Sequence, residues 1–223
     1  FTLQKGLSMI QILWNTLAYS GVLHARDYTE NKHIVLVNGL SILVAMFTFV
    51  NFCVYLFFEI PLFYRASLLI YIFLVPFTIY FNSIGKLLFA RIFITLLSTA
   101  YTSFIVFAQG NQSTAHFFLL AEALVIFFIF PSRDRNWKIG FSVFVFLIFS
   151  AFEIFHESMT PLLAMDPETI LVRKKVMDIL FGVLIIIFAL YINSIFQKSE
   201  LANQLEHEKS ERLLLNILPA PII

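Results

Sequence analysis

Charged residues are scarce in this chain of 223 residues. Asp, Glu, Lys and Arg make up 13% of it, whereas a typical soluble domain contains about 25%. The 15 basic and 14 acidic side chains nearly cancel, which leaves a net charge of +1. This balance gives no sign of the basic surface that binds phosphates, so we expect no nucleic-acid partner.

Cysteine and glycine are also sparse, and their absence excludes several kinds of site. The single cysteine, Cys53, lies in an apolar run, so neither an intrachain disulfide nor a cysteine metal site can form. The chain contains no HExxH, no GxSxG and no glycine-rich phosphate loop. We therefore expect any enzyme activity to belong to residues beyond Ile223. Because the chain begins with Phe1 rather than Met, we expect it to be a portion of a longer protein.

Long apolar runs dominate the sequence. Hydrophobic residues make up 60% of the chain, 28 residues are Phe, and the mean hydropathy is +0.87. Several runs approach the roughly 20 residues that cross a bilayer core. Backbone groups find no water in hydrocarbon, so these runs must be helical, and the alternating polarity of a barrel is absent. The sequence therefore predicts an all-α protein of the inner or plasma membrane, in contact with lipid.

We predict six membrane-spanning helices between residues 34 and 196, the second of them kinked by Pro76. Residues 1–33 are expected to form an amphipathic helix on the membrane surface and a polar segment before the first span. Residues 197–223 are expected to form a cytoplasmic signalling helix that leads into a catalytic domain outside the chain. The predicted spans are residues 34–58, 61–81, 87–108, 115–130, 139–155 and 177–196.

Basic residues predict the orientation of these helices, because cytoplasmic links carry an excess of Lys and Arg. The links after the second and fourth spans contain Lys86 and the run SRDRNWK, and the C-terminal helix carries Lys198, Lys209 and Arg212. The link QGNQST, after the third span, has no charge. Both termini are therefore predicted to be cytoplasmic. Residues 173–175 are an exception, because RKK falls on the outer side, where we expect it either to snorkel to the membrane surface or to pair with nearby acidic residues.

Ionisable residues of the predicted spans converge on the outer half of the membrane. Each such residue costs roughly 2.5–3.5 kcal/mol to insert, so each calls for a partner. We call this set the outer cluster, with Arg65 as its expected countercharge. Its members are His116, Glu122, Glu153, His156, Asp178 and Arg65.

Three interpretations of the outer cluster remain open. It can be a structural network, a sensory pocket for protons or for a small or lipid-like ligand, or a metal or haem site that uses His116 and His156. His24, His33 and His207 lie in polar segments and are expected to be solvated. A transporter would need broken helices in symmetric halves and polar residues at the midplane, and this pattern is not present.

The C-terminal segment combines a charged first half with a leucine-rich second half. Its helix is expected to end near Leu218, because Pro219 cannot continue it. A heptad frame from Ser194 has only three apolar positions in eight, so a parallel coiled coil between two copies would be weak except at its leucine end. The residues expected to transmit a signal along it are Leu201, Leu205, Leu215, Leu218 and Pro219.

The run LLLNILPAPII, residues 213–223, resembles the segment that opens class III nucleotide cyclases, where a helix ends in a leucine-rich N-I-L-P motif. The matching residues are Leu213 to Pro219, with Ile222 at the apolar position that follows. The resemblance covers about the last twenty residues. No histidine-containing phospho-acceptor helix, as in sensor histidine kinases, follows the spans.

The resemblance implies a homodimeric bacterial-type adenylate cyclase. Its catalytic domain would convert ATP to cyclic AMP with two divalent metal ions, Mg or Mn. The membrane region would anchor that domain, hold the dimer together and receive a signal. The alternatives are the sensor region of a histidine kinase or diguanylate cyclase, and a purely structural anchor.

Overall fold

Helices make up the regular structure of the chain. The computed structural model describes residues 11–25, 28–58, 60–110, 114–163 and 167–217, and these ranges contain helices and no strand. The predicted all-α class is therefore confirmed for the described ranges. Short 3-10 helices occupy three of the links, at Val22–His24, Ser132–Asp134 and His156–Ser158.

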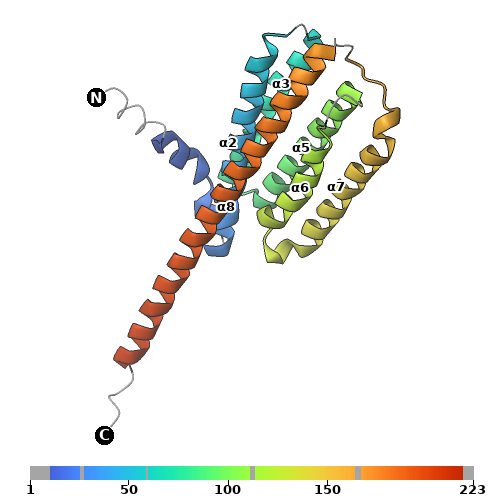
Figure 1. Ribbon diagram of the computed structural model, residues 1–223. Helices are drawn as coiled ribbons and strands as arrows, with labels where there is room; N and C mark the ends of the chain where they lie inside the picture. Colours follow the sequence, from blue (N-terminus) through green and yellow to red (C-terminus); the bar gives the residue numbers. More distant parts are fainter. Residues whose placement is uncertain (1–10, 26–27, 59, 111–113, 164–166, 218–223) are drawn as a thin grey trace, which may run out of the picture.

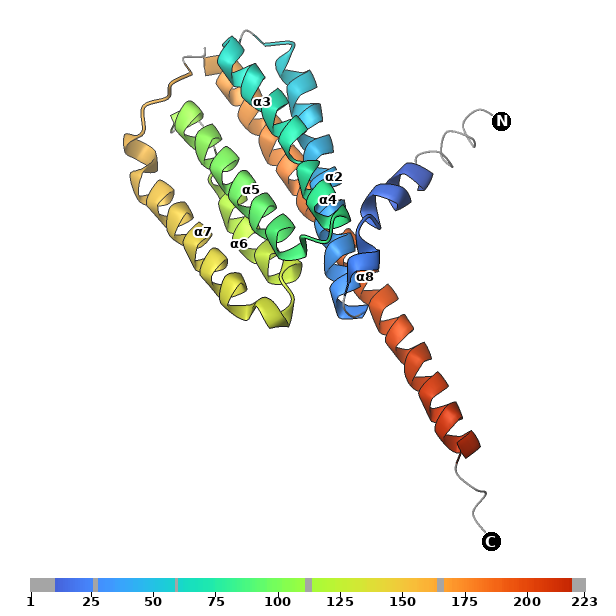
Figure 2. The same ribbon diagram turned by 180° about the vertical axis from the view of Figure 1, so that it is seen from behind.

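The long helices pack side by side and alternate in direction (Figures 1 and 2). The α2–α3, α5–α6 and α7–α8 links lie at the upper end of Figure 1, and the α4–α5 and α6–α7 links at the lower end. The helices are α2 (Tyr28–Tyr55), α3 (Leu62–Leu74), α4 (Phe77–Ser83), α5 (Leu87–Gln109), α6 (Phe117–Ile129), α7 (Arg135–Phe155) and α8 (Pro167–Ile217).

Five helical stretches of the described residues are long and apolar enough to cross a membrane. The shorter apolar helix α6 has 13 residues, which corresponds to about 20 Å, less than the roughly 30 Å of a bilayer core. Membrane insertion thus agrees with the structure, whereas a crossing by the predicted fourth span is not shown. The five stretches are Glu30–Tyr55, Leu62–Ser83, Leu87–Gln109, Ser132–Ser158 and Ile170–Lys198.

The predicted break in the second span is present. Helix α3 ends at Leu74 and α4 begins at Phe77, directly after Pro76. Proline has no N–H to donate to the carbonyl four residues earlier, and its ring crowds that carbonyl. Backbone bonding resumes at once, because the Tyr80 N–H donates to the Pro76 carbonyl. The predicted second span therefore consists of two helices, α3 and α4, which follow one another through the bundle.

The first helix begins earlier than predicted. Helix α2 starts at Tyr28, so the expected boundary between residues 33 and 34 falls inside it. His33 is buried rather than solvated, and its Nδ1 donates to the Phe128 carbonyl over 2.8 Å. The prediction of a solvated His33 was therefore wrong. The run Glu-Asn-Lys-His is polar in composition, but packing of α2 against the end of α6 buries part of it.

Residues before α2 dock onto the bundle through amides. Asn38 is fully buried, and its Nδ2 donates to the Ala18 and Ser20 carbonyls. Its Oδ1 accepts from the Asn82 side chain over 2.7 Å. The chain passes Asn82 at Gly21, where φ is 86° and a Cβ would lie 2.2 Å from the Asn82 carbonyl oxygen. These contacts hold the segment 11–25 against α2 and α4.

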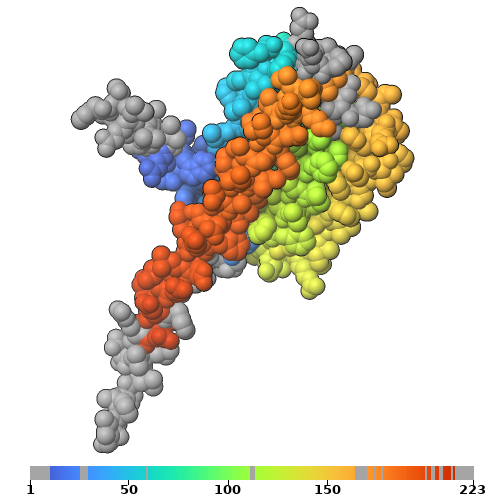
Figure 3. Space-filling model, in the orientation of Figure 1, coloured from blue at the N-terminus to red at the C-terminus, as the bar shows by residue number. Residues whose placement is uncertain are grey.

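Helix α8 is one helix of 51 residues and contains the predicted sixth span, the outer residues before it and most of the signalling helix. The expected boundary between residues 196 and 197 therefore lies inside a continuous helix. It crosses α2 closely at Gly39, where a Cβ would lie 1.9 Å from the Tyr191 hydroxyl. That hydroxyl donates to the Val35 carbonyl over 2.7 Å. Beyond this crossing α8 projects away from the other helices (Figures 1 and 3).

Candidate functional site

Three members of the outer cluster meet at the upper end of the bundle. His116 immediately precedes α6, and its Nε2 lies 3.0 Å from Glu153 Oε2 in the last turn of α7. The His116 ring centroid is 4.6 Å from that of His156, which follows α7. His116 is buried, whereas the Glu153 carboxylate is 55% exposed. The buried imidazole of His116 is therefore paired with a carboxylate that is exposed at the surface of the bundle.

The His116 ring is bonded on one side only. Its Nε2 faces Glu153, whereas its Nδ1 is buried and makes no hydrogen bond to the described residues. Within the same part of the chain, no three His, Cys, Asp or Glu side chains form a group that could hold a metal ion. A metal or haem at His116 and His156 stays a prediction.

Asp178 and Arg65 occupy separate places from this trio. Asp178 lies near the start of α8 and accepts a hydrogen bond of 2.7 Å from the Thr114 hydroxyl, which ties α8 to the link before α6. Arg65, in α3, donates to the Phe58 carbonyl just before its own helix. None of the ion pairs in the described ranges includes Arg65, so the expected countercharge is not brought to the outer cluster.

Glu122 lies deeper than His116 and faces a different helix. Six residues separate them along α6, which corresponds to about 9 Å of rise and a rotation of about 240° around the helix axis. His116 thus faces α7, while Glu122 faces α5. Its Oε1 accepts hydrogen bonds of 2.7 Å from Ser98 and 2.8 Å from Thr99. These bonds direct Glu122 away from the His116–Glu153 pair, so the predicted grouping of Glu122 with His116 is not seen.

Glu122 lines a cavity of about 160 Å³ between α2, α3, α5, α6 and α8. The lining is almost entirely apolar and rich in aromatic rings. The Tyr71 and Tyr101 rings stack there, with centroids 3.9 Å apart and planes 8° from parallel. Phe181 and Phe188 of α8 complete one side. This cavity was not recognisable from the sequence, because its wall residues come from five helices.

A second charged group, missed by sequence reasoning, lies at the lower end. We call it the lower ionic network, and it joins the first turn of α2, the first turns of α5 and the link between α6 and α7. Arg91 Nη1 lies 2.9 Å from Asp134 Oδ2, and Arg91 Nη2 lies 3.7 Å from Glu30 Oε1. Arg133 Nη2 donates to the same Glu30 oxygen over 2.7 Å. The sequence feature that could have revealed this network is Arg91, because a cation one turn inside an apolar helix needs an acidic partner.

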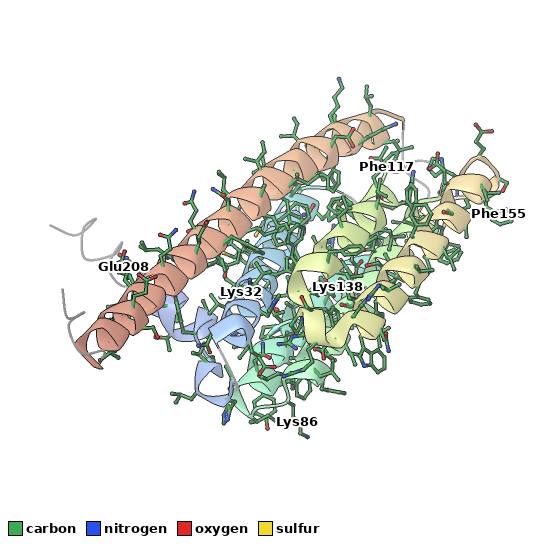
Figure 4. The ribbon with its side chains drawn as sticks, turned by 90° about the horizontal axis from the view of Figure 1, so that it is seen from below. Lys32, Lys86, Phe117, Lys138, Phe155 and Glu208 are labelled. Atoms are coloured by element: carbon green, nitrogen blue, oxygen red, sulfur yellow. The ribbon has the colours of Figure 1, made fainter. Side chains whose placement is uncertain are left out.

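The lower end is also where further lysines lie. Figure 4 views the molecule from below and labels Lys32, Lys86 and Lys138, while Phe117 and Phe155 mark the upper ends of α6 and α7. Lys32 is in the first turns of α2, Lys86 is in the α4–α5 link, and Lys138 is in the first turn of α7. These three lysines therefore share the lower end of the bundle, whereas Lys174 and Lys175, near the start of α8, lie at the upper end.

The residues expected to transmit a signal lie on the projecting part of α8 or past it. Leu201 is 58% exposed and Leu205 is 50% exposed. Leu215 is within α8, although its side chain is not described, and Leu218 and Pro219 lie outside the described residues. The structure thus places part of the transmitting segment on a helix, without testing its role.

These groups can bind ligands and exchange protons. The Glu153 carboxylate of the His116–Glu153 pair is exposed at the surface of the bundle, and Glu122 offers carboxylate oxygens to an apolar cavity.

Comparison with known proteins gives no relative from which a role could be transferred. No family model matches this chain, and neither a curated protein nor a solved structure matches it.

Proposed function

We propose that this chain anchors a bacterial-type class III adenylate cyclase in the membrane and transmits a signal to its catalytic domain. The observation that carries the proposal is the continuity of α8. Its 51 residues correspond to roughly 77 Å, more than twice the thickness of a bilayer core. One half packs in the bundle and the other half projects from it (Figure 3). A shift or rotation of the packed half is therefore carried to the far end by a single rigid element.

The proposed topology has six crossings with both termini in the cytoplasm. Helix α6 is short, but it packs closely against α7 and also contacts α5, so its ends and flanking residues can be buried by neighbours at both membrane boundaries. Basic residues at the lower end favour placing that end in the cytoplasm. In the same scheme, the segment before α2 lies along the membrane surface as an amphipathic helix, in contact with lipid.

The catalytic output rests on the resemblance of residues 213–219 to the cyclase N-I-L-P motif. The implied catalytic domain would use ATP and two Mg or Mn ions, and it would require two copies of the chain. Its signal would enter at the upper end, as a small or lipid-like ligand or as protons. The alternatives are a histidine kinase or diguanylate cyclase output, or an anchor without sensing.

Alanine insertions after Glu200 test the transmitting role. The open reading frame that contains this chain is expressed in a bacterial strain without adenylate cyclase activity, and cyclic AMP is measured. Two inserted residues turn the distal helix by about 200°, whereas seven return it to within about 20° of its original direction. We expect the seven-residue insertion to retain cyclic AMP production. The two-residue insertion should change it about fivefold or more.

Two outcomes contradict separate parts of the proposal. Absence of cyclic AMP from the intact reading frame rejects the cyclase, and formation of cyclic di-GMP or of a phosphohistidine would support an alternative output. Equal production by both insertion variants rejects transmission through the direction of α8 and leaves a simple anchor.

A further inference from the structure

We propose that the cavity around Glu122 is a binding site for a small apolar amine, held in its ammonium form by the Glu122 carboxylate. The cavity lies inside the bundle, and it is separate from the His116–Glu153 pair at the upper end. Its direction distinguishes it from that pair, because Glu122 faces α5 and His116 faces α7. The ligand class follows from the hydrogen bonding, the charge and the shape of this cavity.

The hydrogen bonds at Glu122 leave room for a further donor. The Ser98 hydroxyl lies 2.7 Å from Glu122 Oε1 and 2.8 Å from the Ile94 carbonyl. The Thr99 hydroxyl likewise lies 2.8 Å from both Oε1 and the Thr95 carbonyl. Both hydroxyls contact the same carboxylate oxygen, and each also contacts a backbone carbonyl. An ammonium group brings three donors and no acceptor, so it can donate to the carboxylate without competing for the hydroxyl protons.

The charge at Glu122 also lacks compensation from the protein. None of the ion pairs in the described ranges includes Glu122. A carboxylate charge that is partly buried against an almost entirely apolar lining is costly without a counter-ion, and hydroxyl donors only partly replace water. A cationic head group would supply the missing partner through a charge-assisted hydrogen bond. A ligand carboxylate would add a second negative charge, so we expect it to be excluded.

The walls define the rest of the ligand. About 160 Å³ is comparable with a cavity of roughly 150 Å³ that holds benzene in an engineered protein, so the apolar part should contain about six carbons. The stacked Tyr71 and Tyr101 rings offer a face on which a cation or a flat ring can lie. Phe181 and Phe188 belong to α8, so a ligand here touches the helix that leaves the bundle. The use of this site as a signal input rests on the proposed function of α8, whereas binding itself does not.

Calorimetry on the purified chain in lipid nanodiscs tests the site, with empty nanodiscs as the blank. The probes are n-hexylamine, 1-hexanol and hexanoate, which share a six-carbon chain and differ in the head group. We expect saturable binding of n-hexylamine, binding of 1-hexanol that is about tenfold weaker, and no binding of hexanoate. Glu122→Gln should weaken amine binding about tenfold, because it keeps the shape and removes the charge.

A matched variant and a filled cavity complete the test. Glu157→Gln makes the same chemical change at an exposed position outside the cavity and should leave amine binding unchanged. Val44→Phe fills the cavity from α2 and should abolish binding even if Glu122→Gln does not fold. The proposal is overturned if n-hexylamine does not bind, if it binds no better than 1-hexanol, or if Val44→Phe binds it as the unmodified chain does. These results do not depend on cyclic AMP, so they leave the role of α8 to its own experiment.

Discussion

Arg91 is 1% exposed and lies between two carboxylates that come from distant parts of the chain. Asp134 precedes α7 and Glu30 lies in the first turn of α2, so one guanidinium on α5 joins α2 and the α6–α7 link. Arginine suits this position because its planar fork can donate to two acceptors at once. Arg133 reaches the same Glu30 oxygen from the surface, which leaves two cations and two anions in the lower ionic network.

Removal of Arg91 should therefore be costly. In Arg91→Met the side chain keeps much of its volume, but Glu30 and Asp134 lose their buried partner. We expect the free energy of unfolding to fall by about 3–5 kcal/mol, measured by thermal or denaturant unfolding in detergent. Arg135→Met, at an exposed position next to Asp134 in the chain, is the matched control and should change stability by less than about 1 kcal/mol. Equal effects of the two variants would show that the network contributes no net stability.

Helix α8 has two faces with different surroundings. Phe181, Phe188 and Tyr191 pack toward the other helices, whereas Ile179 and Ile186 are turned about 150° away and are exposed. Such exposure is natural in lipid. It is less so beyond the membrane, where Leu201 and Leu205 are exposed on a polar helix that has no neighbour in the described part of the chain. A lone helix of this kind is marginal in water, so we propose that a second copy covers it as a parallel coiled coil.

Disulfide cross-linking tests this interface. In a Cys53→Ser background, Leu201→Cys should form dimers quickly on mild oxidation in membranes, because an interface brings equivalent residues within about 7 Å between Cα atoms. Leu147→Cys, on the exposed side of α7, is the control and should cross-link slowly. Dimers that form faster through Leu147→Cys than through Leu201→Cys would move the contact from α8 to α7.

The whole molecule has alternating helices and a basic lower end, which together predict its orientation. Reporter fusions after Ser83 and Asn136 should behave as cytoplasmic, and one after Asn111 as external. The pair Asn111 and Asn136 also tests α6, since these positions flank it. Reporters that place both on the same side would mean that α6 does not cross. A fully reversed pattern would contradict the orientation and would place α8's projecting half outside.

Much of this architecture was predictable from local sequence. The apolar runs predicted helices because a backbone in hydrocarbon must satisfy its own hydrogen bonds, and this requirement holds for each run separately. The break at Pro76 was predictable for the same reason, since a missing N–H acts within one turn. The basic links at Lys86 and SRDRNWK could likewise be read without any knowledge of packing.

The grouping of side chains was decided only by tertiary structure. His116 and Glu122 lie in the same predicted layer, yet the rotation of α6 directs one to α7 and the other to α5. His33 looked solvated by composition, but α2 begins early enough to bury it against Phe128. The lower ionic network requires three segments to meet, and the cavity requires five helices. Depth along a helix follows from counting residues, whereas the direction of each side chain depends on how every helix is turned against its neighbours, and no single segment carries that information.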